Sequence, residues 1–213
     1  MSLLKEKDRQ YLEKEFAKLT KPVKLVFFTQ EFECASCRDT HGLLEETASL
    51  SEKIELVIYD LVQDKERAAA YGVKRVPGVI VEGEHDYGIR FFGIPSGYEF
   101  SSLVEDIIAV GTGKTTLSEA TKNKLSQLEK SVHIQVFVTP SCPYCTRAVR
   151  TAHMMAMESE KVTADMIMAN EFPQLSNRYG VMAVPKVVLN EETSFEGAIP
   201  EEDYLSFVTR AAA

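Results

Sequence analysis

The sequence has no tryptophan, no long apolar segment and no cluster of basic residues. Nowhere does it approach the ~20 consecutive apolar residues of a membrane-spanning helix. Its 24 Lys and Arg are outnumbered by 32 Asp and Glu, and no long run of one sign occurs. Nucleic acids and anionic membranes bind clustered positive charge, so the net charge of −8 predicts that neither is a partner.

We also expect no secretory signal, because the short apolar run at the start of the chain is followed at once by charged residues. The expected location is therefore the cytoplasm, where lasting structural disulfides are uncommon and paired cysteines indicate redox chemistry or metal binding. The composition, 45% hydrophobic and 26% charged, is ordinary for a folded globular chain. A length of 213 residues fits one large domain or two modules of about 100 residues each.

What the sequence does contain is an internal repeat built around four cysteines. They form two C-x-x-C motifs, Cys34-Ala35-Ser36-Cys37 and Cys142-Pro143-Tyr144-Cys145, offset by 108 positions. The same offset aligns residues 34–77 with 142–185 without a gap, and 11 of those 44 positions are identical. Chance gives roughly one identity in 15–20. A tandem duplication is the better explanation, and it predicts two equivalent units.

Both units show the same order of predicted elements. In the first, apolar and β-branched content predicts strands over 23–28, 54–59, 78–81 and 86–92, and helices from the motif to about residue 49, over 64–71 and over 101–110. In the second, it predicts strands over 134–138, 162–168, 186–189 and 194–196, and a last helix over 201–210. A helix is predicted ahead of each unit, over 3–19 and 117–130, the latter with a capping box of Thr116 and Glu119.

The element order indicates the fold. A strand–helix–strand crossover implies parallel strands with a right-handed connection, and the later hairpin adds an antiparallel pair. With C-x-x-C at the first helix and Val-Pro before the third strand, this order resembles the thioredoxin fold twice over. The whole chain is similar to the glutaredoxin-like protein disulfide oxidoreductases that carry two such units in tandem. We therefore expect an α/β protein of two thioredoxin-like units, residues 1–112 and 113–213, each a mixed central β-sheet flanked by helices.

The second motif has the features of a reactive cysteine. Two cysteines three apart at a helix start are close enough to form a disulfide, and a helix N-terminus stabilises the thiolate. Ser141 is predicted as the N-cap, and Pro143 then occupies an early position where its missing N–H costs little. With Arg147 nearby, these features predict a lowered pKa for Cys142. In the resembled family the first cysteine attacks and the second resolves, which makes Cys142 the nucleophile and Cys145 the resolving residue.

The resemblance also implies a substrate-binding surface beside each motif. A Val-Pro pair in each unit matches the position of the thioredoxin-fold cis-proline, a minority peptide isomer that marks a fixed turn. The resemblance implies that the proline faces the C-x-x-C, and that the preceding valine offers backbone groups to an extended substrate. The Cys-Pro-Tyr-Cys sequence is itself similar to the glutaredoxin motif. The substrate-contacting residues expected on these grounds are Val76, Pro77, Pro143, Tyr144, Val184 and Pro185.

The first motif is less favourable for a thiolate. It lacks the proline, and Glu31 and Glu33 stand just before Cys34. Nearby carboxylates raise a thiol pKa, although Arg38 and the helix dipole oppose this effect. We hypothesise that Cys34 is the slower nucleophile, and that its pair with Cys37 relays electrons or provides a second potential. The relative alkylation rates of the two pairs test this hypothesis.

Proton transfer from the resolving cysteine of the second motif has no evident partner in the sequence. Thioredoxin itself has a buried acid in the strand before its motif, whereas the strand over 134–138 offers only Gln135. Deprotonation of Cys145 must therefore use another group or water. This departure fits glutaredoxin better than thioredoxin.

Several alternative interpretations stay open. Paired C-x-x-C motifs of a zinc site usually sit ~15–20 residues apart, whereas 104 residues separate these two, so we expect no metal. One or both pairs can be static structural disulfides, the first more readily than the second. The run 111–115 resembles part of a nucleotide-binding loop, but Ile108 stands where that pattern needs glycine, so we interpret it as a linker. His41, one turn beyond Cys37, either tunes that cysteine or lies on a solvated face.

The leading prediction is a thiol–disulfide oxidoreductase of the protein disulfide reductase or isomerase type. It exchanges electrons with protein disulfide and dithiol substrates at two sites, the second dominant. The resemblance implies a flavin-dependent, thioredoxin-type reductase as electron source, a peroxiredoxin as acceptor, and a role in cell redox homeostasis, with no cofactor held by this chain. A related layout exists in bacterial peroxiredoxin reductases, but there the first unit lacks its cysteines. The alternative is a peptide-binding scaffold of the same fold, because a fold alone does not prove activity.

Overall fold

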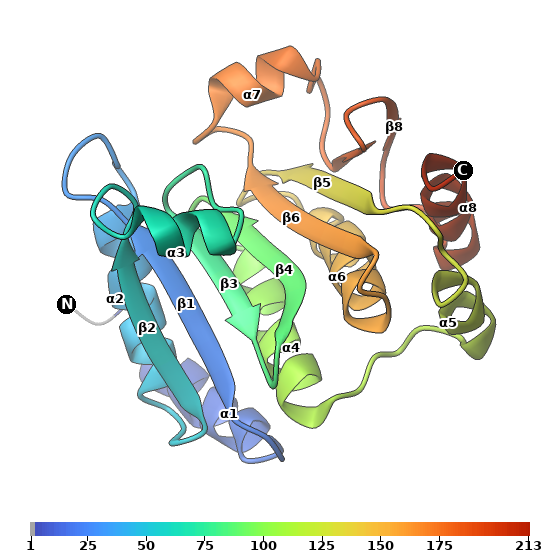
Figure 1. Cartoon of the computed structure of the whole chain (residues 1–213). Helices are drawn as coiled ribbons and strands as arrows, with labels where there is room; N and C mark the ends of the chain where they lie inside the picture. The colour runs from blue at the N-terminus through green and yellow to red at the C-terminus, as the bar shows by residue number, and fades with distance from the viewer. Residues whose placement is uncertain (1–2) are drawn as a thin grey trace.

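The computed structural model describes residues 3–213 and folds them around one continuous eight-stranded β-sheet (Figure 1). Met1 and Ser2, at the start of the segment in which no signal peptide is expected, lie outside the described residues. The strand order across the sheet is β2-β1-β3-β4-β6-β5-β7-β8. The strands are β1 (Val23–Thr29), β2 (Ile54–Asp60), β3 (Gly78–Glu82), β4 (Asp86–Phe92), β5 (Val132–Val138), β6 (Val162–Met168), β7 (Lys186–Leu189) and β8 (Thr193–Glu196).

Helices cover the two faces of this sheet unequally. One face carries α1, α2, α4, α5, α6 and α8 over a hydrophobic core that runs through both units, while within residues 3–213 the other carries the short α3 and α7 (Figure 1). No helix within residues 3–213 is long and apolar enough to cross a membrane. The helices are α1 (Glu6–Phe16), α2 (Cys37–Ala48), α3 (Lys65–Ala70), α4 (Glu99–Thr112), α5 (Glu119–Leu125), α6 (Cys145–Glu158), α7 (Pro173–Arg178) and α8 (Glu201–Ala211).

The two predicted units are present and have the same internal pairing. In each, the first strand pairs parallel with the second and antiparallel with the third, and the third forms a hairpin with the fourth. The central strands β1 and β5 are buried along almost their whole length, since helices cover both faces there. The predicted α/β architecture, with a mixed sheet flanked by helices in each unit, is confirmed.

The two sheets are joined by parallel pairing of β4 with β6, a contact that the sequence pattern does not predict. Ile89 to Phe92 align with Ala164 to Ile167. Gly88 permits this approach, because a Cβ atom there would lie 3.0 Å from the carbonyl oxygen of Val162, and its φ of +81° is one that other residues rarely adopt. The joint converts two small sheets into one.

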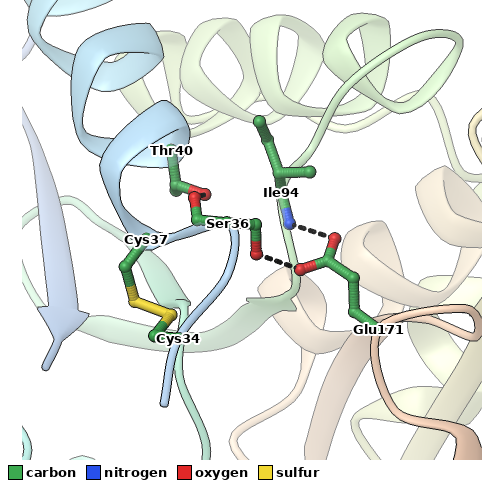
Figure 2. Close-up of a disulfide and its surroundings, with 6 residues drawn as sticks. All are labelled: Cys34, Ser36, Cys37, Thr40, Ile94 and Glu171. Atoms are coloured by element: carbon green, nitrogen blue, oxygen red, sulfur yellow. Dashed lines mark hydrogen bonds between the residues drawn. A yellow bond between two sulfur atoms is a disulfide. The ribbon is translucent and has the colours of Figure 1, made fainter. Parts of the chain in front are cut away.

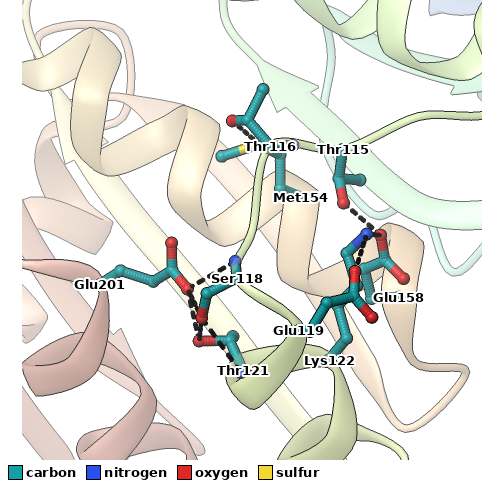
Figure 3. A network of polar contacts seen from close by, with 9 residues as sticks. All are labelled: Thr115, Thr116, Ser118, Glu119, Thr121, Lys122, Met154, Glu158 and Glu201. Carbon is teal, nitrogen blue, oxygen red and sulfur yellow. Dashed lines mark hydrogen bonds and ion pairs between the residues drawn. The ribbon is translucent and has the colours of Figure 1, made fainter.

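The segment between the units differs from its predicted form. The helix expected over 117–130 is α5, which ends at Leu125, and its N-cap is Ser118, whose Oγ accepts a hydrogen bond from the Thr121 N–H at 3.2 Å. The predicted capping box of Thr116 and Glu119 is wrong. The acid at this helix start comes from the distant α8: Glu201 Oε1 accepts from the Ser118 N–H at 3.0 Å and from the Ser118 and Thr121 hydroxyls (Figure 3).

The end of the first unit also differs slightly from its prediction. Part of the run 111–115, interpreted above as a linker, is helical, because α4 continues through Thr112 and ends at Gly113, whose φ of 65° lies in the left-handed region. Only the residues after Gly113 connect α4 to α5. The division of the chain at residues 112 and 113 stays a prediction.

The β4–β6 joint generates a stability prediction. Gly88→Ala places a methyl group against the β6 backbone at a positive φ, whereas Gly180→Ala carries the same backbone penalty (φ +59°) with nothing within 4 Å. We expect Gly88→Ala to lower the free energy of unfolding by about 1–3 kcal/mol more than Gly180→Ala. Urea unfolding of both variants measures the difference, and equal losses would show that the joint tolerates the extra atom.

Candidate active site

Both C-x-x-C motifs lie where a central strand gives way to a long helix. The first follows β1 and opens α2, and the second follows β5 and opens α6. Because the sheet pairing makes β1 parallel to β5, the two motifs lie at the same edge of the sheet. In each motif the cysteines form a disulfide, with a Cα–Cα distance of 5.5 Å. A pair of cysteines placed in this way can open and close its disulfide by thiol–disulfide exchange.

Burial distinguishes the two cysteines of each pair. Cys145 is fully buried, and Cys142 is 8% exposed. In the first pair Cys37 is 5% exposed, whereas Cys34 is only partly buried. In both pairs the first cysteine is thus the more accessible, which suits a nucleophile followed by a protected resolving residue.

The start of α6 differs from its prediction. The helix begins at Cys145 with Tyr144 as its N-cap residue, so Ser141 is not the cap. Cys142 lies in the turn that leads into the helix: its N–H donates to the Thr139 carbonyl at 3.2 Å, and its carbonyl accepts from the Cys145 N–H at 3.4 Å. Because Cys142 forms this turn, the helix does not begin where a cap at Ser141 would place it. The disulfide to Cys145 still holds the Cys142 sulfur at the helix N-terminus.

A cis peptide bond precedes each predicted proline, Val76–Pro77 and Val184–Pro185, which confirms both isomers. At the second site Val184 O lies 3.7 Å from Cys142 Sγ, so this turn faces the disulfide. Within residues 3–213 neither valine makes a hydrogen bond to another backbone group. Their backbone groups are therefore free to pair with an extended substrate.

Exposed apolar side chains gather around the second motif. Tyr144, a predicted substrate-contacting residue, has 68% of its surface exposed, and Met182, two residues before Val184, is 91% exposed. Tyr98 comes from the first unit and is 49% exposed; its backbone N–H donates to the carbonyl of Pro140 at 3.1 Å. Sequence reasoning missed Tyr98 and Met182, because only the folded chain brings them beside the motif.

A buried acid also lies on α4, the helix of the first unit that packs against α6. Glu99 opens α4 directly after Tyr98, and α4 packs against α6. Its side chain is fully buried; one carboxylate oxygen accepts from Ser102 Oγ at 2.7 Å, and the other has no partner within the described residues. Burial raises the pKa of Glu99 to about 7, although the Ser102 hydrogen bond and nearby His153 oppose the rise. No sequence pattern indicates this acid, because it belongs to the other unit.

A second carboxylate contacts the first motif. Glu171, between β6 and α7, accepts a hydrogen bond from the hydroxyl of Ser36, which stands between the two cysteines (Figure 2). Glu31, Glu33 and Arg38, the charged neighbours expected from sequence, are exposed to solvent. The carboxylate that contacts the motif therefore comes from the second unit.

In the described part of the chain, no group of three or more His, Cys, Asp or Glu side chains is placed to hold a metal ion. His41 lies on α2 beyond Cys37 and pairs with Glu45 on the same helix, at 3.3 Å.

A family model described as a thioredoxin domain matches the chain twice, over residues 24–105 and 132–208. The chain belongs to the thioredoxin domain family. Each match contains one C-x-x-C motif, so this thioredoxin-domain protein carries two such units in tandem.

Whole-length similarities extend beyond the single domain. A protein disulfide oxidoreductase from Aeropyrum pernix is 34% identical with a TM-score of 0.92, over 98% of this chain and 93% of that one. A mutant of the alkyl hydroperoxide reductase protein AhpF from Enterococcus faecalis is 30% identical with a TM-score of 0.89, over 96% of this chain and 98% of that one. The expected resemblance to tandem protein disulfide oxidoreductases is confirmed.

A curated relative is much longer than this chain. The alkyl hydroperoxide reductase protein AhpF of Pseudomonas putida is 29% identical over 211 residues, which are 99% of this chain but 38% of the relative. The thioredoxin-domain protein thus corresponds to a minor part of that relative's length.

The raised pKa of Glu99 gives a stability prediction. The pKa of this carboxyl is near 4.5 in the unfolded chain and near 7 in the folded protein. Between these pH values the folded state binds more protons than the unfolded state, so the free energy of unfolding falls as the pH rises. Glu99→Gln cannot ionise and escapes this loss. We expect the variant to gain about 3 kcal/mol in unfolding free energy relative to the parent between pH 5 and pH 8. Urea unfolding at both pH values measures the gain, and a difference that is constant with pH would contradict the buried, titrating carboxyl.

Proposed function

We propose that this thioredoxin-domain protein is a thiol–disulfide oxidoreductase acting on protein substrates, with Cys142 and Cys145 as its principal pair and Cys34 and Cys37 as a second pair. The observation that carries the proposal is the geometry of the second motif. There a disulfide with one partly accessible sulfur faces the unpaired backbone of Val184 at 3.7 Å. The similarity to a protein disulfide oxidoreductase over nearly the whole chain supports the same function.

The substrate docks as an extended segment. Its backbone pairs with the free groups of Val184 beside Pro185, in the manner of an added strand. The exposed side chains of Tyr144, Met182 and Tyr98 give this segment apolar contacts, and Pro143 lies exposed in the same motif. Val76 and Pro77 provide the equivalent turn at the first motif.

The chemistry is a two-step exchange when the pair is reduced. The Cys142 thiolate attacks one sulfur of the substrate disulfide, forming a mixed disulfide and releasing the other substrate sulfur as a thiolate, which takes up a proton. Cys145 then loses its proton and attacks Cys142 Sγ, which releases the second substrate thiol and closes the protein's own disulfide. Two electrons pass to the substrate, and the reverse sequence oxidises a substrate dithiol.

Glu99 provides the proton acceptor that the strand before the motif lacks. It is buried at the start of α4, which packs against α6, one of its oxygens has no partner among residues 3–213, and its pKa of about 7 allows it to gain and lose a proton at neutral pH. In this role it takes the proton of Cys145 in the resolving step. The acid comes from the first unit and the thiol from the second, so catalysis at the second motif requires both.

The reducing equivalents come from another protein. We infer a flavin-dependent, thioredoxin-type reductase as donor and a peroxiredoxin among the acceptors, because this chain is similar to part of the alkyl hydroperoxide reductase protein AhpF. This chemistry suits a reductase or isomerase of protein disulfides that acts in the cytoplasm. The chain itself needs no cofactor for the exchange steps written above.

Insulin reduction by dithiothreitol tests the assignment of the principal pair. We expect Cys142→Ser to lower the catalysed rate by about 100-fold or more, because it removes the attacking sulfur. Cys34→Ser keeps most of the rate, and Ser141→Ala, an exposed neighbour that is not the helix cap, serves as the matched control. A rate that depends on Cys34 instead would reverse the order of the sites. No catalysis by the unmodified chain would favour the scaffold module.

A further inference from the structure

A single carboxylate joins the second unit to the first motif. Glu171 Oε2 accepts a hydrogen bond from Ser36 Oγ, and Glu171 Oε1 accepts one from the backbone N–H of Ile94 at 2.9 Å (Figure 2). The Ser36 carbonyl in turn accepts bonds from the Thr40 N–H at 2.9 Å and from its hydroxyl at 2.8 Å, in the first turn of α2. The carboxylate is therefore connected through Ser36 to the start of the helix that carries Cys37.

The chain is built to let this carboxylate approach. Gly93 has a φ of +92°, and a Cβ atom there would collide with Met168 Cβ and lie 2.9 Å from Glu171 Oε1. Gly93 donates its N–H to the carbonyl of Pro77, and Gly197 does the same for Pro185 in the second unit. A Cβ at Gly197, however, meets nothing within 4 Å. The close packing is thus particular to the first motif.

The repeat shows that the second motif has no equivalent of this contact within the described residues. Subtracting the offset of 108 from residue 171 gives Gln63, which is neutral and exposed, and adding it to Ser36 gives Tyr144, which is 68% exposed. Neither Glu171 nor Ser36 therefore has a residue of the same kind at the equivalent position of the other unit. The two motifs therefore share their cysteine spacing, but only the first is contacted by a carboxylate of this kind within residues 3–213.

We propose that Glu171 is a positioning residue for the first pair: it fixes Ser36 between Cys34 and Cys37 and holds a negative charge at the start of α2, which disfavours the Cys34 thiolate. A thiolate at a helix N-terminus is stabilised by the helix dipole and by unpaired N–H groups. A fixed carboxylate at the same place opposes that stabilisation. The first pair is then the slower nucleophile and the more stable disulfide. This inference rests on the proposed thiol–disulfide exchange at that pair.

Other charged residues stand close to Cys34 in the sequence. Glu31, Glu33, Arg38 and Asp39 are all exposed, so water and salt screen them. Arg75 lines the same cavity of about 480 Å³ as Glu171, but its guanidinium stacks on the Phe92 ring at 5.5 Å. Glu171 is half-buried and hydrogen-bonded into the motif itself. These contacts hold its carboxylate in place.

Alkylation of the reduced full-length chain as a function of pH tests the proposal. Glu171→Gln keeps the shape of the side chain and one acceptor oxygen but removes the charge. We expect the midpoint of the Cys34 alkylation profile to fall by about one pH unit, with the Cys142 profile unchanged. Iodoacetamide labelling followed by peptide mass analysis separates the two cysteines. Because alkylation needs neither substrate nor partner, this test stands even if the chain does not catalyse disulfide exchange.

Glu31→Gln is the matched control, since it removes an exposed carboxylate that is closer to Cys34 in sequence. We expect it to leave the Cys34 midpoint within a few tenths of a pH unit of the parent. An unchanged Cys34 midpoint in Glu171→Gln would overturn the proposal, as would an equal shift in Glu31→Gln. A shift of both Cys34 and Cys142 in Glu171→Gln would reveal a general loss of structure and would equally overturn it.

Discussion

The parallel pairing of β4 with β6 is the contact on which the rest of the molecule depends. Two thioredoxin-like sheets could pack in many ways, but this pairing fuses them edge to edge and aligns Ile89 to Phe92 with Ala164 to Ile167. It makes β1 parallel to β5, so both motifs emerge at one edge of the common sheet. It also brings α4 against α6 and the loop after β6 against the loop after β4. The chemistry of each motif is therefore set partly by the other unit.

Exchange of acidic residues across the joint makes the two motifs different. The first unit supplies Glu99, fully buried at the start of α4, the helix that packs against α6 of the second unit. The second unit supplies Glu171 to Ser36 in the first motif. The first acid has one oxygen without a partner in the described part of the chain and is poised to move a proton near neutral pH, whereas the second is bound on both oxygens and acts as a fixed charge. We propose that the duplicated motif thereby acquires two roles without a change in its cysteine spacing.

Local patterns predicted the local structure well. The strands follow from runs of apolar and β-branched residues, the repeat revealed the two units, and the resemblance to thioredoxin located both cis-prolines. The expected cap at Ser141 fails because of a local turn from Thr139 to Cys145. The other failures involve long-range contacts: Ser118 rather than Thr116 caps α5, and Glu201 reaches it from α8. Glu99 and Glu171 were missed for the same reason: no spacing rule connects a residue of one unit with the motif of the other.

Separate redox titration of the two pairs tests the central claim that their surroundings make them chemically distinct. The full-length chain is equilibrated in dithiothreitol or glutathione buffers, alkylated and analysed by peptide mass. The account predicts two different potentials, both within roughly −180 to −300 mV, with the Cys34–Cys37 pair the more reducing because its thiolate is less stabilised. Coincident potentials would contradict the distinction between the sites, and pairs that both stay oxidised well below about −300 mV would be structural disulfides rather than redox centres.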